Sequence, residues 1–254
     1  PLERGGVPAL KRQLVDLGYQ EVITYSFIDP KMQDLLAPGS TPRVLENPMS
    51  QDLSVMRTSM LPGLVDALQA NIARQQDRVR LFEVGQCFLP TENGEVAQPL
   101  MVGAVLWGRR HPESWNLADE AVDFFDLKGD MERLLSWSGR RDVTFRPAGD
   151  PVLHPGQSAE ILAVGEVVGR LGRLHPEIEQ HLDVTGEVYL LEVLAGAILS
   201  HTRRRHGVVS RYPSVRRDLA IVVPEAVPAA EIVQILSQSL QQVLVDLRLF
   251  DVYQ

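Results

Sequence analysis

The sequence predicts an α+β fold. Helix and strand patterns are mixed along the chain rather than strictly alternating, which argues against a doubly wound parallel sheet. Two segments, 61–72 and 123–137, carry an apolar stripe at the helical period. Short segments rich in β-branched residues lie around them, and hairpin-type turns such as Asn93-Gly94 separate these segments. We therefore expect an antiparallel sheet flanked by helices.

The first predicted elements are an amphipathic helix, a strand and a short second helix. Apolar residues at helical spacing run from Val7 to Leu17, and Gly18 then occupies the position at which glycine commonly ends a helix. Residues 21–28 are rich in Val, Ile, Thr, Tyr and Phe, which predicts a strand. The pair Asp29-Pro30 is typical of a helix start.

The central helix has the clearest signal. Its apolar residues follow the helical spacing, and they are Leu61, Leu64, Val65, Leu68 and Ile72. Thr58 or Ser59 can cap its N-terminus, and Pro62 sits in the first turn, where a missing N–H costs nothing. Strands are predicted next over 79–88 and 100–107, from their β-branched and aromatic residues.

A second strong helix covers 123–137 and is followed by Gly139. Short strands then dominate, at 143–146, 159–164, 167–174 and 188–193. A hairpin turn is expected at Gly165-Glu166, and His175-Pro176-Glu177 starts a further helix.

The last part of the chain has a different texture. A polar and basic stretch over 200–207 is a plausible linker. Beyond it the pattern predicts a strand at 219–223, a helix at 228–240 and a second strand at 243–253. We therefore expect a separate β-α-β unit at this end.

Composition sets limits on the class of protein. At 254 residues the chain has room for one large domain, or for one domain and a smaller one. No apolar run approaches the ~20 residues of a membrane helix, and no signal peptide is visible. Cys87 is the single cysteine, which excludes an internal disulfide. We expect Cys87 to be a small buried hydrophobe and the protein to be cytoplasmic.

The charge balance bears on nucleic-acid binding. The formal net charge is −8, from 33 acidic and 25 basic residues, so any nucleic-acid contact must be local. Positive charge is concentrated in one stretch of the sequence, at Arg203, Arg204, Arg205, His206, Arg211, Arg216 and Arg217. This cluster is either a solvated linker or a hinge that contacts phosphates.

An ordered set of motifs runs through almost the whole chain. They are Asn47-Pro48-Met49-Ser50, Met56-Arg57-Thr58-Ser59-Met60-Leu61-Pro62-Gly63-Leu64, Arg80-Leu81-Phe82-Glu83-Val84-Gly85, Trp115-Asn116-Leu117, 123–130, 154–159, 172–177, 211–218 and 249–253. Together they resemble the β subunits of bacterial phenylalanine–tRNA ligases. Each motif alone is weak, and the ordered set is specific.

The resemblance implies a fold and a domain division. Residues 1–207 are expected to form a catalytically inactive, class II aminoacyl-tRNA synthetase-like core, an antiparallel sheet flanked by helices. Residues 208–254 are expected to form the first half of a ferredoxin-like anticodon-binding domain, whose full pattern is β-α-β-β-α-β. The chain thus resembles the C-terminal region of a longer protein, cut inside its last domain.

The resemblance also implies partners and cofactors. A separate catalytic α subunit would use ATP and Mg²⁺ in an (αβ)₂ assembly with tRNA(Phe), while this chain binds no cofactor and no metal of its own and contacts no membrane. A subunit interface is expected at Asn47, Pro48, Met49, Ser50 and Arg57, before the long helix. Contact with tRNA is expected at Arg203, Arg204, Arg205, Arg216 and Arg217.

The residues expected of a class II active site are missing. Such a site needs arginines that offset the charge of the triphosphate, one of them in a strand of the form Phe-Arg-x-Glu. Here the strand reads Arg80-Leu81-Phe82-Glu83, which places Arg80 and Glu83 on opposite faces. The glycine-containing stretch 165–173 could supply a second arginine, and it is better interpreted as a structural hairpin. No catalytic residue is predicted.

Other chemistries have less support. The six histidines show no zinc-ligand spacing, and the sequence has neither a P-loop nor a serine nucleophile elbow. An acidic run at Asp119, Glu120, Asp123, Asp126 and Asp130 is better explained by a helix N-terminus than by a metal site.

Three hypotheses for the function follow. We favour a non-catalytic scaffold for an α subunit. The alternatives are an autonomous class II ligase with an unusual active site and a stand-alone RNA-binding module.

Overall fold

The computed structural model divides the chain into two compact units, Pro1–Arg204 and Arg205–Gln254. Each unit is described here by itself. The residues that the structure describes are 6–91, 93–140, 142–199, 213–224, 227–240 and 243–253. The linker predicted over 200–207 lies outside them. Among the described residues, no helix is both long and apolar enough to cross a bilayer.

A seven-stranded sheet forms the centre of the first unit, with the strand order β1-β4-β7-β11-β10-β9-β8. Its strands are β1 (Gln20–Glu21), β4 (Arg78–Gln86), β7 (Leu100–Gly108), β8 (Val143–Pro147), β9 (Leu153–Ala163), β10 (Glu166–Leu174) and β11 (Val188–Leu194). Neighbouring strands are antiparallel, except that β1 runs parallel to β4. Two small two-stranded antiparallel sheets complete the strands, β2 (Phe27–Ile28) with β3 (Val55–Met56) and β5 (Leu89–Pro90) with β6 (Val96–Ala97).

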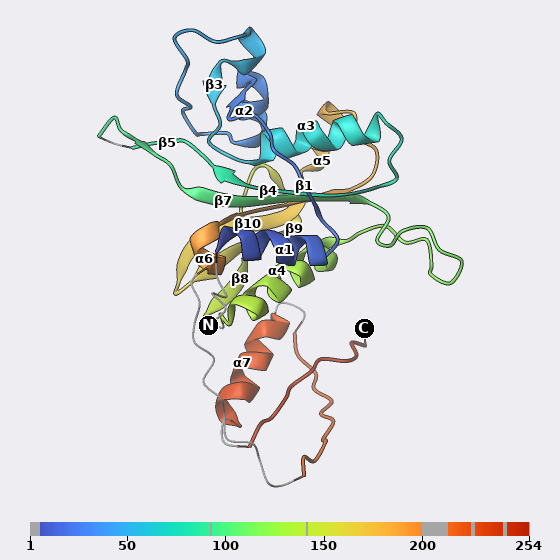
Figure 1. The fold of residues 1–254 in the computed structure, drawn as a ribbon. Helices are drawn as coiled ribbons and strands as arrows, with labels where there is room; N and C mark the ends of the chain where they lie inside the picture. The colour runs from blue at the N-terminus through green and yellow to red at the C-terminus, as the bar shows by residue number, and fades with distance from the viewer. Residues whose placement is uncertain are drawn as a thin grey trace. The chain divides into compact units, whose positions relative to one another are not determined.

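Helices cover both faces of this sheet (Figure 1). One face packs against α2 (Pro30–Leu36), α3 (Leu61–Ile72) and α5 (Pro176–His181). The other packs against α1 (Val7–Asp16), α4 (Phe124–Ser138) and α6 (Ala195–Leu199). A one-turn 3₁₀ helix, Gln51–Leu53, precedes β3. The predicted antiparallel sheet flanked by helices is thus confirmed.

Two hydrophobic cores, one on each face, follow from the alternation of side chains along the strands. In β4, Phe82 belongs to the core under α1 and α4, whereas Val79 and Leu81 belong to the core under α3. Gly103 in β7 permits a close approach of α3. A Cβ at Gly103 would lie 2.7 Å from Cδ1 of Leu64, so any side chain there would push the helix away.

The helix ends follow the predicted chemistry. Asp123 and Asp126 form a capping box at the start of α4, and Gly139 ends that helix in the left-handed conformation, with φ of 77°. At α3 the hydroxyl of Ser59 accepts a hydrogen bond from the backbone N–H of Leu61 at 3.1 Å. Two aspartates of the acidic run, Asp123 and Asp126, therefore cap the N-terminus of α4.

Several predictions for the first unit need correction, and one of them is the start of β9, which lies at Leu153 rather than at residue 159. Residues 21–28 form two short strands in different sheets, because the chain leaves β4 after Val22 and crosses to pair with β3. The turn between β9 and β10 is Val164-Gly165, one residue earlier than predicted, with φ of 54° and 84°. The helix α6 has no counterpart in the sequence interpretation.

The prediction for the tail is right for its helix and wrong for its strands. The helix α7 spans Ala229–Ser239, within the predicted 228–240. The described residues of 219–223 and 243–253 form no strand, and most of their side chains are exposed. A strand needs a neighbour that accepts and donates backbone hydrogen bonds, and the described part of the tail offers none.

These differences predict unequal stability of the two units. Helix α7 has no buried residue, whereas α3 buries Leu61, Leu64, Val65 and Leu68. Opening of the tail should therefore require far less free energy than opening of α3. Native-state hydrogen exchange on the isolated, monomeric chain should show weak protection at 219–223 and 243–253 and strong protection at α3. Equal protection in a monomer would contradict this expectation.

Candidate functional site

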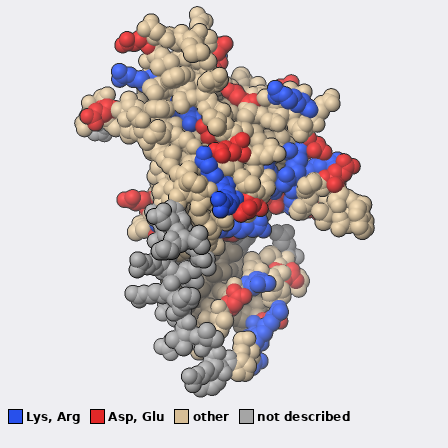
Figure 2. Space-filling model, in the orientation of Figure 1, with Lys and Arg blue, Asp and Glu red and all other residues tan. Residues whose placement is uncertain are grey.

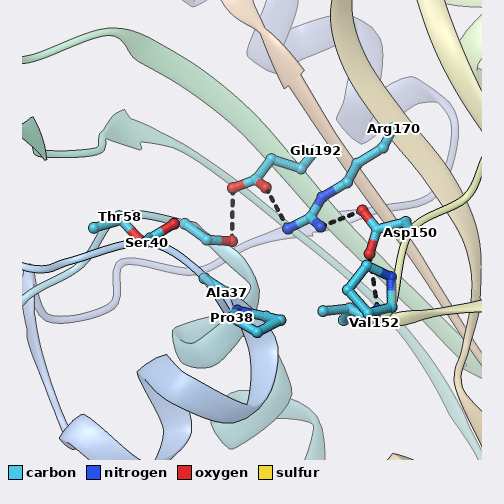
Figure 3. Close-up of a pocket in the computed structure, with 10 residues that line it drawn as sticks. Ala37, Pro38, Ser40, Thr58, Asp150, Val152, Arg170 and Glu192 are labelled. Atoms are coloured by element: carbon cyan, nitrogen blue, oxygen red, sulfur yellow. Dashed lines mark hydrogen bonds and ion pairs between the residues drawn. The ribbon is translucent and has the colours of Figure 1, made fainter.

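A polar pocket of about 280 Å³ opens on the α3 face of the sheet, where α3 begins (Figure 3). Thr58 and Ser59 line it from the start of α3, Arg170 from β10, Glu192 from β11, and Asp150 from the loop before β9. Adjacent strands therefore supply the central pair, since β10 and β11 place Arg170 directly opposite Glu192.

Arg170 is held by two carboxylates inside this pocket. Its Nη1 lies 2.5 Å from Oδ2 of Asp150, and its Nη2 lies 3.1 Å from Oε2 of Glu192. Figure 3 shows the guanidinium group between the two acids. Burial lowers the pKa of Arg170, and the charges of Glu192 and Asp150 raise it by more, so the guanidinium stays charged.

The two acids are themselves fully engaged. Oε1 of Glu192 accepts a hydrogen bond from the hydroxyl of Ser59 at 2.9 Å and from the backbone N–H of Met60 at 2.6 Å. Oδ1 of Asp150 accepts one from the backbone N–H of Val152 at 2.8 Å. One guanidinium thus faces two carboxylates, and the excess negative charge disfavours a triphosphate ligand.

The sequence interpretation of this region was partly right. The stretch 165–173 is a hairpin strand, as predicted. It nevertheless brings Arg170 to the pocket, although the hairpin interpretation gave that arginine no role. The only signal in the sequence was an arginine at a strand position facing the α3 core, and its partner Glu192 is identified only by the pairing of β10 with β11.

Arg80 and Glu83 lie on opposite faces of β4, as their spacing predicts. Nη1 of Arg80 reaches Oδ2 of Asp130 on α4 at 2.9 Å. Glu83 points the other way and binds Nη1 of Arg57 at 2.9 Å. The two side chains therefore cannot contact one ligand together.

Arg57 and Glu83 form a buried ion pair with side chains that are 3% and 6% exposed. Thr24 completes the cluster, because its hydroxyl accepts from Nη1 of Arg57 at 2.9 Å and donates to Oε2 of Glu83 at 2.6 Å. Nε of Arg57 donates to the carbonyl of Gln86 at 2.9 Å. A Cβ at Gly85 would lie 2.4 Å from Nη2 of Arg57, so only glycine leaves room for the guanidinium.

Four of the five residues predicted at a subunit interface are exposed, Asn47, Pro48, Met49 and Ser50. Met49 is 87% exposed, which is unusual for a large apolar side chain. The fifth, Arg57, is buried in the ion pair with Glu83. Its direct contribution is to the interior of this chain, and its place in a subunit interface stays a prediction.

The residues predicted to contact tRNA lie in the second unit or outside the described residues. Arg203, Arg204 and Arg205 are not among the described residues. Arg216 is exposed, donates to Asp218 at 3.2 Å, and lies over the Phe250 ring at 5.7 Å from its centroid. Arg217 is exposed. Their contact with tRNA stays a prediction.

The single cysteine and two of the histidines, His154 and His175, have structural surroundings. Cys87 is buried, and burial, more than the neighbouring charge of Glu192, raises the pKa of its thiol to about 12. This confirms the expected buried hydrophobe. His154 and His175 each accept a hydrogen bond from a backbone N–H two residues ahead. Among the described residues, no group of three His, Cys, Asp or Glu side chains could hold a metal ion.

Two families match the chain. Residues 6–194 match the family described as phenylalanyl tRNA synthetase beta chain CLM domain, and residues 210–254 match the ferredoxin-fold anticodon binding domain. Over 255 residues the chain is 46% identical to a phenylalanine–tRNA ligase beta subunit of Pseudomonas putida, covering 100% of this chain and 32% of that relative. The corresponding subunit of Photorhabdus laumondii is 46% identical, with coverage of 96% and 31%. The chain thus spans about a third of the length of the curated relatives it matches.

The fold itself is similar to that of a solved synthetase. A pyrrolysyl tRNA synthetase from Desulfitobacterium hafniense superposes with a TM-score of 0.57 and 15% identity, covering 77% of this chain and 66% of that chain. A second structure of the pyrrolysyl enzyme from the same organism gives the same TM-score. At this identity the likeness concerns the fold alone, and it confirms the class II synthetase-like arrangement.

The buried Arg57–Glu83 pair generates a stability prediction. Arg57→Met should lower the free energy of unfolding of the first unit by about 3–5 kcal/mol, because it leaves Glu83 buried and unpaired. The matched control is Arg146→Met, which breaks a pair with Glu160 in which Arg146 is 60% exposed and should cost at most about 1 kcal/mol. Urea unfolding followed by tryptophan fluorescence measures both, since all three tryptophans lie in the first unit. Equal losses of unfolding free energy in the two variants would show that the buried pair contributes no more to stability than the exposed pair.

Proposed function

Because this chain belongs to the family of phenylalanyl-tRNA synthetase beta chains, we propose that it is part of the β subunit of a phenylalanine–tRNA ligase. Within that enzyme it acts as a non-catalytic scaffold. A separate α subunit activates phenylalanine with ATP and Mg²⁺, and the β subunit supports α and helps to bind tRNA(Phe). The assembly is an (αβ)₂ heterotetramer in the cytoplasm, and this chain supplies no catalytic residue and binds neither ATP nor Mg²⁺ for the reaction.

The proposed non-catalytic role rests on one observation, that Arg170 is held in ion pairs with two carboxylates of the chain. Class II chemistry needs arginines that are free to offset the charge on ATP. Arg170, which faces the pocket on the synthetase-like sheet, is already bound to Asp150 and Glu192. Arg80, the arginine of the diagnostic strand, lies on the other face and is bound to Asp130.

Exposed apolar side chains support a subunit contact near the predicted interface. Ile23, Tyr25, Val44 and Met49 are 65–89% exposed. They belong to segments joined by backbone hydrogen bonds, since Arg57 donates to the carbonyl of Ser26 and Val44 pairs with Val55. Large apolar residues grouped on one exposed region are typical of a protein-binding surface.

The distribution of charge supports a limited role in tRNA binding. On the face seen in Figure 2, the blue basic and red acidic side chains lie interleaved rather than in separate fields. With a net charge of −8, the chain lacks the broad basic surface of a stand-alone RNA-binding module. We assign the tRNA contact to the basic residues 203–217 at the start of the anticodon-binding-like tail.

The scaffold proposal predicts that activity requires the α subunit. When the chain is co-expressed with a phenylalanine–tRNA ligase α subunit, we expect the two to co-purify and the complex alone to catalyse ATP–pyrophosphate exchange. Exchange by the isolated chain would favour the autonomous ligase instead. Failure to co-purify, together with tRNA binding by the isolated chain that falls steeply with salt, would favour the RNA-binding module.

The interface is tested by a charge placed on its apolar part. Met49→Asp should weaken co-purification with the α subunit at least tenfold while leaving the unfolding curve unchanged, because Met49 is 87% exposed. Val164→Asp is the matched control, since Val164 is 79% exposed in the turn between β9 and β10. Undiminished co-purification of the Met49 variant would remove residues 47–50 from the interface.

A further inference from the structure

A second pocket, of about 270 Å³, lies on the opposite face of the sheet from Arg170. It is formed where the start of β4 meets α4 and the loop that follows β7. Its charged lining consists of Arg78 and Arg80 from β4, Arg110 from the loop, and Asp126, Asp130 and Arg133 from α4. His111 also lines it. Neither the interface nor the tRNA contacts proposed above use these residues.

Arg78 is an unpaired cation in this pocket. No hydrogen bond or ion pair joins its side chain to any other residue that the structure describes, and its Nε is buried. Nε of Arg80 is also buried and has no hydrogen-bond partner among the described residues. Only 9% of the Arg80 side chain is exposed. Buried N–H groups without an acceptor are rare in folded proteins, so the two Nε atoms mark this region as one in which the chain leaves arginine donors unpaired.

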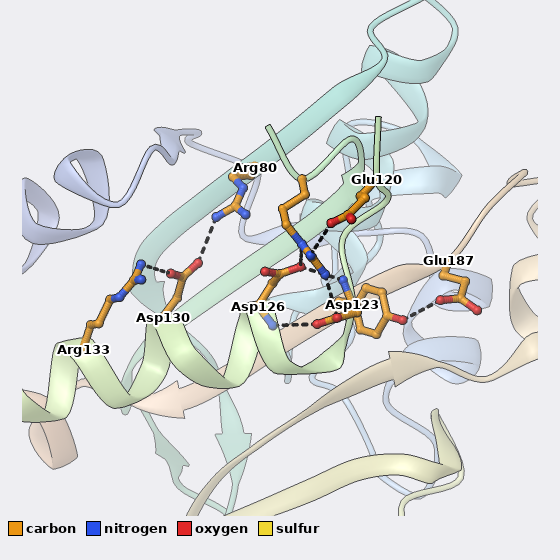
Figure 4. A network of polar contacts seen from close by, with 9 residues as sticks. Arg80, Glu120, Asp123, Asp126, Asp130, Arg133 and Glu187 are labelled. Carbon is orange, nitrogen blue, oxygen red and sulfur yellow. Dashed lines mark hydrogen bonds and ion pairs between the residues drawn. The ribbon is translucent and has the colours of Figure 1, made fainter. Parts of the chain in front are cut away.

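The charged groups around Asp130 leave a local surplus of positive charge. Figure 4 shows Asp130 between Arg80 and Arg133, which contact its two oxygens at 2.9 Å and 3.2 Å. Three guanidinium groups, those of Arg78, Arg80 and Arg133, therefore line the pocket beside the single carboxylate of Asp130, which pairs with Arg80 and Arg133 but not with Arg78. Arg110 instead contacts three acids, Glu120, Asp123 and Asp126, so its side of the pocket carries excess negative charge.

The two acids that line the pocket, Asp126 and Asp130, are each hydrogen-bonded to donors of the chain. Oδ2 of Asp130 accepts from the hydroxyl of Tyr19 as well as from Arg80, and Oδ2 of Asp126 accepts from Arg110 and from a backbone N–H. Their charges are thus already bound to donors. Burial first, and then the neighbouring charge of Arg80, lowers the pKa of Arg78, which is the direction expected of a cation that lacks an anion.

We propose that this pocket binds a phosphate group, with Arg78 as its main anchor and the N–H groups of Arg133 that do not contact Asp130 as further donors. A phosphate suits the site better than a carboxylate. It carries up to two negative charges, which match the surplus, and its tetrahedral oxygens can accept from donors that converge from β4 and α4. The phosphate comes either from the backbone of an RNA or from free inorganic phosphate, and phosphate binding itself does not depend on the α subunit.

The test uses the full chain and two probes at constant ionic strength, inorganic phosphate and a short oligouridylate. Binding is measured by calorimetry and by the shift in melting temperature. Arg78→Gln should weaken binding at least about tenfold, because a hydrogen bond to a charged group is worth more than one factor of ten. Arg78→Lys keeps the charge but loses the planar fork of donors, and it should retain part of the affinity.

Arg146→Gln is the control variant, since Arg146 is an exposed arginine on β8 outside the pocket. It should bind both probes as the wild type does. Binding of oligouridylate without inorganic phosphate identifies an RNA backbone as the source, and the reverse identifies free phosphate. Failure of both probes to bind, or binding that Arg78→Gln and Arg146→Gln affect equally, would overturn the proposal.

Discussion

The buried pair of Arg57 and Glu83 is the interaction on which the rest of the first unit depends. Arg57 is tied to β4 through Glu83 and the carbonyl of Gln86, and to the crossing segment through Thr24. Its position fixes where α3 begins, and the next two residues, Thr58 and Ser59, line the pocket. Ser59 then binds Glu192, and Glu192 binds Arg170. The backbone from Arg57 to Ser59 therefore joins two sets of polar contacts, one on β4 and the other on β11 and β10.

This arrangement supports the proposal that this synthetase-like fold is a non-catalytic part of its enzyme. In an active site, arginines are held in place but left free to meet charge that arrives with the substrate and grows in the transition state. In this chain two arginines, one on each face of the sheet, meet acids of the chain itself, Arg170 with Glu192 and Arg80 with Asp130. These ion pairs hold strands and helices in place relative to each other within the folded chain. Such rigidity suits the proposed role as a support for another subunit.

Local patterns were predictable, and long-range pairing was not. The stripe from Leu61 to Ile72 and the Asp123 cap identify α3 and α4, because both signals lie within a few residues. Spacing alone also placed Arg80 and Glu83 on opposite faces of β4. The pocket depends on Arg170 lying opposite Glu192, which follows from strand order rather than from sequence spacing. The tail strands were predicted from composition, yet a strand forms only where a neighbour pairs with it.

The surplus of positive charge beside Arg78 is compatible with an acidic chain. A net charge of −8 acts over the whole molecule, but salt screens exposed charges beyond about 8 Å at physiological ionic strength. Inside a pocket, the groups within hydrogen-bonding distance dominate, and partial burial increases their effect. Here β4 brings Arg78 and Arg80 to α4, which adds Arg133, while Asp126 of the same pocket is bound to Arg110. The sign of the local field is therefore set by how β4 and α4 pack, and the overall composition does not reveal it.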